Sequence, residues 1–522
     1  MTRTRLVHDF LAGAADRDPG KKALFAQGRW HAYGWLEEQA NRFAALLLRS
    51  GLRRGDRVAL LLENSAEYVI TYYAVLKAGG ITVALNTEST ADDVEYIVRD
   101  CGVRFLVTGP RLLARACPPP RAPEPGAPAA REPLLEALFL WSGRAAERTA
   151  LARSGPVLLP EAYAGETAAP PPARLVDLDV ASIVYTSGST GRPRGATLSH
   201  LNIVSNTRSI VEYLGLTPAD RILVVLPFYY IYGKSLLNTH VAVGGSVVID
   251  NRFLYPNVVL QTLREQEATG FAGVPSTFTI LLSRSTLKSS TFPSLRYVTQ
   301  AGGAMAPAVQ KQVAEAFAPA RLFVMYGATE ASARLSYLDP SDLPRKWGSI
   351  GKAIPNVDLF VADEAGTPLG PGREGEIVAR GSNIMSGYWN HPEETAAVLR
   401  NGLYYTGDIG RMDEEGFLYV VGRTKDMIKI GGNRVSAKEI EEALYEHPAV
   451  LEAAVIGVPD EVLGEAPKAF IAVRPGSPDD VVGGLPAFLQ KRLAPYKVPK
   501  LYEVRPALPK NDAGKIQKLK LR

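Results

Sequence analysis

Apolar and polar residues alternate along the first hundred positions with two different periods. Between Trp35 and Leu47, apolar residues recur at three- and four-residue steps, which predicts an amphipathic helix. Continuous apolar runs at 58–62, 81–85 and 103–108 are typical of buried strands. This alternation predicts an α/β fold, in which a mostly parallel sheet carries helices on both faces.

Polar residues mark where two of the predicted helices begin. Asn64 and Ser65 can cap a helix that ends at about Lys77. Ser436, followed three residues later by Glu439, fits a capping box for a helix that runs towards position 447.

Proline-rich segments at 118–128 and 168–173 interrupt the pattern. Such density of proline favours extended chain, so we expect surface excursions within a large N-terminal domain. The α/β pattern resumes at Val180. After a turn-rich segment, the strand-like run at 375–379 predicts a β subdomain over about 355–424.

The last hundred residues predict a small α+β domain. Strands are expected at 450–458 and 469–473, and a helix at 485–493. We therefore predict two domains, a large one at 1–424 and a small one at 425–522.

Composition limits the class of protein. The 522 residues exceed what one hydrophobic core usually serves, and 46% hydrophobic and 22% charged residues are ordinary for a globular protein. A net charge of +5, without a basic stripe, does not favour nucleic acid. Two cysteines, Cys101 and Cys117, support neither a disulfide framework nor a zinc site. No secretory signal or clean membrane span is evident, so we expect a cytoplasmic protein with no integral membrane segment.

The segment with the clearest chemistry is 185–195, Tyr-Thr-Ser-Gly-Ser-Thr-Gly-Arg-Pro-Arg-Gly, which follows a short strand-like run. Glycines allow close approach of a ligand, and consecutive turn amides and hydroxyl groups bind anions. Two arginines add cationic donors. The segment lacks the lysine of the P-loop and the Gly-x-Gly-x-x-Gly of dinucleotide sites. It therefore predicts a polyphosphate-binding loop of another kind.

This loop and four further motifs, in the same order, resemble those of the adenylate-forming superfamily, which includes acyl-CoA synthetases, adenylation domains of non-ribosomal synthesis and beetle luciferases. Among these, the chain looks closest to the acyl-CoA synthetases. Arg194 stands where the family usually has lysine. The further motifs are Tyr-Gly-Ala-Thr-Glu at 326–330, Tyr-Thr-Gly-Asp at 405–408, Gly-Arg-Thr-Lys-Asp at 422–426 with Ile-Lys-Ile-Gly-Gly at 428–432, and Pro-Lys-Asn-Asp-Ala-Gly-Lys at 509–515.

The resemblance implies an ATP site in which the glycine-rich loop holds the β- and γ-phosphates and an acidic residue binds the ribose. It also implies a flat wall beside the adenine, and it places Tyr326 where its ring stacks on the base. The residues that match are Thr186, Ser187, Gly188, Ser189, Thr190, Gly191, Arg194, Gly302, Gly303, Ala304, Tyr326, Gly327, Asp408 and Arg423.

Adenylation joins a carboxylate to the α-phosphate of ATP and expels pyrophosphate, so it depends on positioning and charge stabilisation. The resemblance assigns Lys515 to bridge the substrate carboxylate and the α-phosphate. It places Thr329 at the α-phosphate and Glu330, with Thr190, at a Mg²⁺ ion.

Family members make their product in two half-reactions, between which the C-terminal domain rotates. The resemblance implies a hinge at Lys425. It also implies a passage for the pantetheine arm of CoA, lined by Lys429, Gly431, Gly432 and Tyr230.

The acid pocket is the least constrained part of the resemblance. Tyr230 replaces a histidine that is usual in acyl-CoA synthetases, and the aspartate typical of amino-acid-activating domains is absent. Lys234 could contact a second acidic group of the substrate, but we expect its side chain to be exposed to solvent. The expected pocket residues are Tyr229, Tyr230, Gly273, Val274, Gly302 and Gly327.

The leading hypothesis is an ATP-dependent acid–thiol ligase that uses ATP, Mg²⁺ and CoA on a small carboxylic acid. A homodimer is considered as its oligomeric state. A second hypothesis is a freestanding ligase that loads the pantetheine of an acyl carrier protein. A third, from another class, is a catalytically silent nucleotide-binding module. The presence of Glu330, Asp408 and Lys515 argues against the third.

Overall fold

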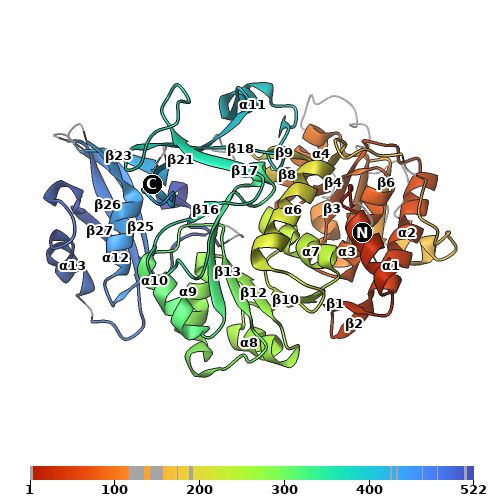
Figure 1. Ribbon diagram of the computed structural model, residues 1–522, viewed down its shortest axis with the longest axis horizontal. Helices are drawn as coiled ribbons and strands as arrows, with labels where there is room; N and C mark the ends of the chain where they lie inside the picture. The colour runs from red at the N-terminus through yellow and green to blue at the C-terminus, as the bar shows by residue number, and fades with distance from the viewer. Residues whose placement is uncertain are drawn as a thin grey trace, which may run out of the picture. The chain divides into compact units, whose positions relative to one another are not determined.

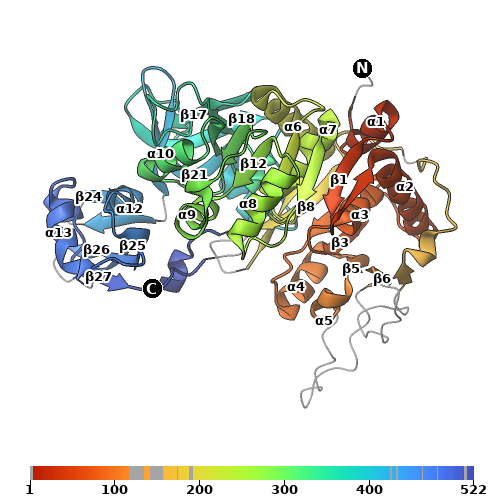
Figure 2. The same cartoon turned by 90° about the horizontal axis from the view of Figure 1, so that it is seen from below.

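A computed structural model describes residues 4–116, 135–141, 157–172, 174–186, 192–423, 426–430, 433–460, 463–478, 480–510 and 514–521. The expected excursion at 118–128 lies outside these residues. The chain forms two compact units, shown in two views in Figures 1 and 2. Unit 1 comprises Met1–Asn251, Thr329–Ala333 and Ser382–Ala397. Unit 2 comprises Arg252–Ala328, Arg334–Gly381 and Val398–Arg522. The predicted boundary at 424/425 stays a prediction.

The main sheet of unit 1 has eight strands in the order β19-β9-β8-β4-β3-β5-β6-β7. Strands β8, β4, β3, β5, β6 and β7 are mutually parallel. At the other edge, β9 is antiparallel to β8, and β19 is antiparallel to β9. The strands are β3 (Arg57–Leu61), β4 (Ile81–Ala84), β5 (Phe105–Thr108), β6 (Ala137–Trp141), β7 (Val157–Leu159), β8 (Val180–Thr186), β9 (Arg194–Ser199) and β19 (Gly387–Tyr388).

A second group of strands in unit 1 runs in the order β10-β11-β1-β2. These strands are β1 (Lys22–Ala26), β2 (Arg29–Ala32), β10 (Arg221–Val224) and β11 (Ser246–Ile249). The helices of the unit are α1 (Asp9–Arg17), α2 (Tyr33–Arg49), α3 (Ala66–Lys77), α4 (Ala91–Cys101), α5 (Leu113–Ala116), α6 (His200–Leu214) and α7 (Ile231–Val243), and α11 (Pro392–Val398) begins there.

The main sheet is covered on both faces, as the sequence predicts. Ala59 and Leu61 of β3 pack against Val94 and Ile97 of α4, because alternate residues of a strand point to one face. Figure 2 shows α4 and α5 on one side of β3 and β5, with α3 on the other. Helix α3 is buried along almost its whole length, which explains its apolar composition.

In unit 2, five strands follow the order β16-β15-β14-β13-β12, of which β12, β13 and β14 are parallel. They are β12 (Gly270–Gly273), β13 (Tyr297–Gln300), β14 (Arg321–Tyr326), β15 (Ser336–Leu338) and β16 (Lys352–Ala353). Three helices connect or flank them, namely α8 (Pro256–Glu265), α9 (Pro275–Arg284) and α10 (Pro307–Ala316).

The expected β subdomain forms an antiparallel sheet in unit 2. Its strands are β17 (Val357–Ala362), β18 (Glu374–Gly381), β20 (Leu399–Arg400), β21 (Leu403–Met412) and β22 (Leu418–Arg423). The β17–β18 register pairs Val357 with Gly381, and the β18–β21 register pairs Glu374 with Arg411.

The last part of unit 2 has the expected α+β composition. Its sheet contains β23 (Met427–Ile430), β24 (Asn433–Ser436), β25 (Val450–Asp460), β26 (Gly464–Val473) and β27 (Leu501–Val504), with helices α12 (Ala437–Tyr445) and α13 (Val481–Gln490). Figure 1 shows α12 and α13 beside these strands. Ile440, Leu444 and Leu485 are among the buried residues of this core.

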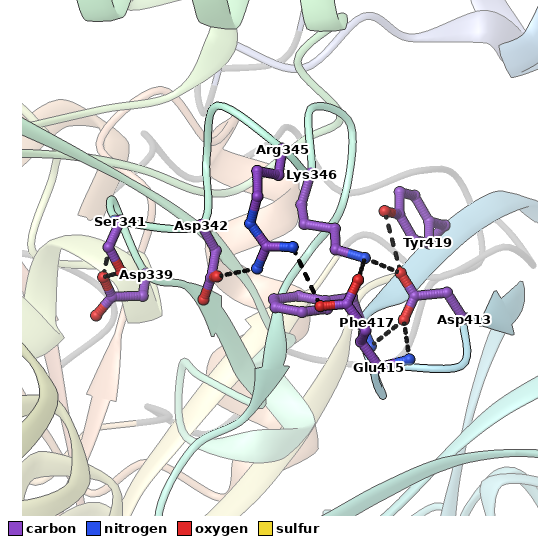
Figure 3. Close-up of polar contacts among 9 residues, drawn as sticks. All are labelled: Asp339, Ser341, Asp342, Arg345, Lys346, Asp413, Glu415, Phe417 and Tyr419. Atoms are coloured by element: carbon purple, nitrogen blue, oxygen red, sulfur yellow. Dashed lines mark hydrogen bonds and ion pairs between the residues drawn. The ribbon is translucent and has the colours of Figure 1, made fainter.

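A cluster of charged side chains on unit 2 joins the segment 339–346 to the turn between β21 and β22 (Figure 3). Lys346 contacts Asp413 at 2.8 Å, and Arg345 contacts Glu415 at 3.2 Å. The Lys346 ammonium also lies 4.7 Å from the centre of the Phe417 ring. The segment 339–346 and the turn between β21 and β22 are thereby joined by more than one ion pair.

Candidate active site

The two ends of the glycine-rich loop face each other across a hairpin in unit 1. Strands β8 and β9 are antiparallel, and Thr186 at the end of β8 pairs with Arg194 at the start of β9. A Cβ atom on Gly195 would lie 2.5 Å from the Ile183 side chain, so the close packing of the hairpin requires glycine there. The residues between the ends that were expected to bind phosphate, Ser187, Gly188, Ser189, Thr190 and Gly191, lie outside the described residues.

Glu330, the expected metal ligand, is held by Tyr388 of the neighbouring strand. The Tyr388 hydroxyl donates to Glu330 Oε1 at 2.7 Å, and burial followed by the charge of Glu330 raises the pKa of Tyr388. The Arg194 guanidinium lies 4.8 Å from the centre of the Tyr388 ring, a cation–π distance. Residues from three separate parts of the sequence therefore meet beside Thr186 at the loop end, because β19 pairs with β9.

The donor set at Glu330 fits a Mg²⁺ ion that is bound mainly by a nucleotide. Mg²⁺ often takes one or two carboxylates together with substrate phosphates. Among the described residues, no group of three or more His, Cys, Asp or Glu side chains could hold a metal by itself. A single carboxylate, oriented by Tyr388, suits a site in which the nucleotide supplies most of the metal ligands.

The other half of the expected nucleotide site lies at the carboxyl ends of three parallel strands of unit 2. Gly273 ends β12, Gln300 ends β13 and Tyr326 ends β14. Gly302, just after β13, has φ +84°, and its missing side chain leaves room for Val274. Gln300 Nε2 donates to the carbonyl of Gly303 at 2.8 Å and fixes this turn. Ligands bind at such strand ends in open α/β sheets.

Gly302 to Ala304 are exposed at this edge, as a wall beside a bound base requires. Gly327 follows Tyr326 directly and is partly buried. Tyr326 belongs to unit 2 and Thr329 to unit 1, so the 326–330 motif contributes residues to both units.

Asp408 is the centre of a hydrogen-bonded group in unit 2. Tyr326 donates its hydroxyl to Asp408 Oδ2 at 2.6 Å, and Arg423 Nε donates to Oδ1 at 2.8 Å. Asp408 and Arg423 face each other in the β21–β22 pair. The charge of Asp408 raises the pKa of Arg423, and burial, followed by that charge, raises the pKa of Tyr326. A carboxylate has about four acceptor positions, so two remain for further hydroxyl donors.

Lys515 lies in unit 2 close to this group. Gly514, at φ +74°, packs so tightly that a Cβ atom there would lie 2.2 Å from Ser276 Oγ. Lys515 as a residue is exposed to solvent, although protein atoms gather around its ammonium. This desolvation, followed by the positive charge of Arg423, lowers the pKa of Lys515 to about 8, and Asp408 opposes the shift.

The expected pocket residues Tyr229 and Tyr230 lie before α7 in unit 1, with ring centres 4.7 Å apart. The backbone that leads to them is fixed by Asn64, which accepts from the Phe228 N–H at 2.7 Å and donates to the Leu226 carbonyl at 2.9 Å. Asn64 therefore anchors this segment, whereas Ser65 alone caps α3, by accepting from the Tyr68 N–H at 3.2 Å.

The expectation that Lys234 is exposed is wrong. Its residue exposure is 1%, because α7 is buried and Gly233 lets the helix approach the preceding segment. A Cβ atom on Gly233 would lie 2.1 Å from the Pro227 carbonyl oxygen. A side chain on this part of α7 therefore points into the interior.

Of the expected thiol passage, only part is described. Lys429 lies on β23, where its backbone N–H donates to Glu465 at 2.7 Å. The hinge residue Lys425 and the glycines Gly431 and Gly432 lie outside the described residues. Their roles stay predictions.

Two positioning residues, Tyr388 and Asn64, were not predicted. Tyr388 sits in a short Gly-Tyr-Trp segment without periodicity, and its contact with Glu330 depends on pairing between β9 and β19. Asn64 looks like a helix cap, and its second role depends on a segment more than 160 residues away. No helix in the described ranges is long and apolar enough to cross a bilayer.

The Glu330 group of unit 1 and the Lys515 group of unit 2 each contain a motif that resembles those of adenylate-forming enzymes. A family model described as AMP-binding enzyme matches residues 11–389, and one described as AMP-binding enzyme C-terminal domain matches residues 439–515. The chain therefore belongs to the AMP-binding enzyme family. It is an AMP-forming acid–thiol ligase.

Individual relatives agree with this assignment. A long-chain-fatty-acid–CoA ligase of Bacillus subtilis (strain 168) is 34% identical, over 99% of this chain and 94% of its own length. The anthranilate CoA ligase AuaEII in complex with anthranoyl-AMP superposes with a TM-score of 0.88 at 27% identity, covering 99% of this chain and 96% of its own. ATP-bound MatB from Rhodopseudomonas palustris gives 0.84 at 32%, covering 99% and 98%.

Proposed function

We propose that this protein activates a carboxylic acid as its acyl-adenylate, with release of pyrophosphate, and then transfers the acyl group to the thiol of CoA. The observation that carries the residue assignment is the position of Gly514–Lys515. This segment lies against Ser276, at the start of α9, and near the Asp408–Arg423 pair. One cation is thereby next to a candidate acid-binding segment and a candidate ribose-binding carboxylate.

In this proposal, Asp408 accepts hydrogen bonds from the ribose hydroxyls with its remaining acceptor positions. Arg423 orients the carboxylate by its hydrogen bond of 2.8 Å. Tyr326 does the same from the other oxygen, and its ring packs beside the base.

Lys515 acts where negative charge gathers as the carboxylate attacks the α-phosphate. Its ammonium donates to the incoming carboxylate and to a phosphate oxygen, which removes the repulsion between the two anions. The lowered pKa of Lys515 reflects an ammonium that is partly stripped of water, and such a cation interacts more strongly with an anion than a fully hydrated one.

Mg²⁺ belongs to the proposal through Glu330. When bound, the ion would neutralise charge on the triphosphate. Tyr388 keeps one Glu330 oxygen occupied and so directs the other away from the Tyr388 ring. The glycine-rich loop, whose ends are Thr186 and Arg194, would hold the phosphates.

Acid-dependent release of pyrophosphate tests the function directly. A panel of benzoates, cinnamates and medium-chain fatty acids should contain at least one acid that makes pyrophosphate and AMP from ATP, and ADP should not form. ADP as the sole nucleotide product would contradict the proposal. Transfer to free CoA, compared with transfer to a carrier protein in a matched reaction, then identifies the acceptor; we expect CoA.

Location in the cytoplasm and a homodimeric state are also proposed. Cell fractionation and light scattering after size-exclusion chromatography test them separately from the chemistry.

A further inference from the structure

Two lysines in unit 1 are almost completely buried, and their surroundings differ. Lys77 on α3 is 4% exposed and forms an ion pair of 2.6 Å with Glu37. Lys234 on α7 is 1% exposed, and no carboxylate lies within ion-pair distance of it in the described part of the chain. An ammonium group that is buried without a counter-charge is costly, and isolated cases usually have a functional reason.

The contacts of Lys234 are all neutral. Nζ donates to Ser182 Oγ at 3.2 Å and lies 5.3 Å from the centre of the Tyr72 ring. Burial lowers the pKa of Lys234 to about 7. An ammonium has three N–H donors, so one hydroxyl partner leaves donor capacity unused.

A second polar side chain points to the same place. Asn238, one turn after Lys234 on the same face of α7, is 2% exposed. Its amide donates to the Tyr72 hydroxyl at 3.4 Å, and its Oδ1 atom is buried without a partner. Turned by 180°, the amide would accept from Tyr72 and leave an NH₂ group unpaired instead. Buried polar atoms are normally paired, so this amide indicates a missing partner.

The position of these groups connects them with the acid pocket. The Lys234 N–H donates to the Tyr230 carbonyl at 3.0 Å, so Lys234 lies one helical turn beyond a proposed pocket residue. Ser182 lies on β8, four residues before Thr186 at the start of the glycine-rich loop. Four residues of strand span about 13 Å. Lys234 is therefore a near neighbour of a proposed pocket residue on α7, and its partner Ser182 lies away from the phosphate-binding end of β8.

We infer that Lys234 and Asn238 form a binding site for a second anionic group at the far end of the acid substrate, with Ser182 holding the lysine in place. This rests on the proposed function, because it presupposes that an acid binds beside Tyr230. The preferred substrate class is then a dicarboxylic acid of medium length, or an acid whose distal end carries another anion. A short dicarboxylate cannot reach from the phosphates to Lys234.

Matched pairs of acids test the inference. Adipate, suberate and sebacate are compared with hexanoate, octanoate and decanoate in acid-dependent ATP–pyrophosphate exchange. The wild-type protein should use at least one dicarboxylate with a kcat/KM at least tenfold above that of the monocarboxylate of equal length. Lys234→Met, which keeps the length of the side chain without its charge, should reverse this ratio.

The control is the double variant Lys77→Met/Glu37→Gln, which removes the other buried lysine together with its partner. This variant should keep the wild-type ratio, because Lys77 and Glu37 neutralise each other in the wild-type protein and neither is available to a substrate. A binding readout that needs no turnover accompanies the kinetics. The dicarboxylate should raise the Tm of the wild-type protein, and it should not raise the Tm of Lys234→Met.

The outcomes separate the two proposals. The anion site is overturned if exchange with monocarboxylates equals or exceeds exchange with dicarboxylates and Lys234→Met does not change this ratio. The ligase function is unaffected by that outcome. Absence of exchange with every acid, in a folded protein, contradicts the ligase function. In that case the Tm measurement still decides whether Lys234 binds an anion.

Discussion

At the scale of single residues, Lys515 gives a pH dependence whose sign follows from its lowered pKa. The ammonium must be protonated to stabilise the reacting anions, and its pKa of about 8 means that the cationic fraction falls above that pH. We expect kcat/KM for adenylation to decrease as pH rises through about 8, since this ratio reports groups of the free enzyme.

Lys515→Arg identifies the group responsible. Arginine stays charged at all accessible pH values, so the decrease at high pH should disappear even though the longer side chain lowers the rate. Lys515→Ala should lose roughly 100- to 1,000-fold in adenylation, as expected when one preorganised donor is removed. Lys520→Ala, an exposed neighbour, is the control. An unchanged decrease in Lys515→Arg would mean that another group titrates.

Tyr388 tests the proposed metal site. Tyr388→Phe removes the hydroxyl that donates to Glu330 at 2.7 Å but keeps the ring beneath Arg194. A hydrogen bond to a charged group contributes about 1.5–3 kcal/mol, so we expect the binding of the metal–ATP complex to weaken by roughly 10- to 150-fold. Mn²⁺ with a non-hydrolysable ATP analogue, followed by electron paramagnetic resonance, measures this without turnover. Equal affinity in both proteins would show that Tyr388 does not position Glu330.

Several site residues were predicted because they belong to contiguous motifs. Thr186, Tyr326 and Asp408 lie at strand ends or in strands, where the motifs place them. The burial of Lys234 was not predicted. A single lysine after a glycine looks like a surface residue, and its contacts with Ser182 and Tyr72 come from distant segments that the local sequence does not reveal.

At the scale of elements, the turn that carries Lys515 gives a test of placement. Gly514→Ala introduces both an unfavourable φ and a contact with Ser276, whereas Gly372→Ala introduces a similar φ strain with nothing within 4 Å. Such a φ costs about 1 kcal/mol or more for alanine. Adenylation should fall at least tenfold in Gly514→Ala and stay within twofold in Gly372→Ala. Equal kinetics would show that the contact with Ser276 does not position the lysine.

The charged cluster of Figure 3 predicts an acid-sensitive contribution to stability. Partial burial opposes the ionisation of Asp413, but hydrogen bonds from Lys346 and the Phe417 N–H outweigh it and lower the pKa of Asp413. The contribution is therefore present above the ordinary aspartate pKa of about 3.9 and is lost as pH falls through the lowered value.

Lys346→Met measures this contribution. At pH 7 its Tm should be about 1–2 °C below that of the wild-type protein, and the difference should shrink as pH falls towards 3. Lys288→Met, in the 3₁₀ turn Leu287–Ser289, is the exposed control. A Tm difference that stays constant with pH would assign the effect to packing on Phe417 instead of charge.

Helices and strands with clear periodicity were predicted closely. The helix between Trp35 and Leu47 is α2, and the runs at 58–62, 81–85 and 103–108 overlap β3, β4 and β5. The Ser436 cap is also present, since its hydroxyl accepts from the Glu439 N–H at 3.4 Å. Strand partners were not predicted. Short pairs such as β9–β19 depend on contacts across nearly 190 positions, which a local pattern does not contain.

At the scale of the whole molecule, the two half-reactions depend on the proposed hinge at Lys425. Proline there fixes φ near −65° and restricts the residue before it, so the rotation between orientations should be blocked. We expect Lys425→Pro to retain adenylation within about threefold and to lose thioester formation at least tenfold. Single-turnover measurements of acyl-AMP and acyl-CoA separate the steps. Equal loss of both would argue against a hinge at this position.

The α/β class of the chain was predicted from alternating periods, and its membership of the AMP-binding family from ordered motifs. The division of the chain between the units was not. Unit 1 takes up Thr329–Ala333 and Ser382–Ala397 from much later in the sequence, and excursions of this kind follow from side-chain packing and strand pairing that single segments do not encode.

This discontinuity has a consequence for synthesis on the ribosome. Until β19 emerges, β9 has a free backbone edge beside the glycine-rich loop. At a translation rate of about 5–20 residues per second, the wait between the end of β9 and the emergence of β19 lasts roughly 10 to 40 seconds. During that interval the nascent chain exposes a template for strand pairing, so a nascent-chain chaperone or rapid translation would favour correct folding.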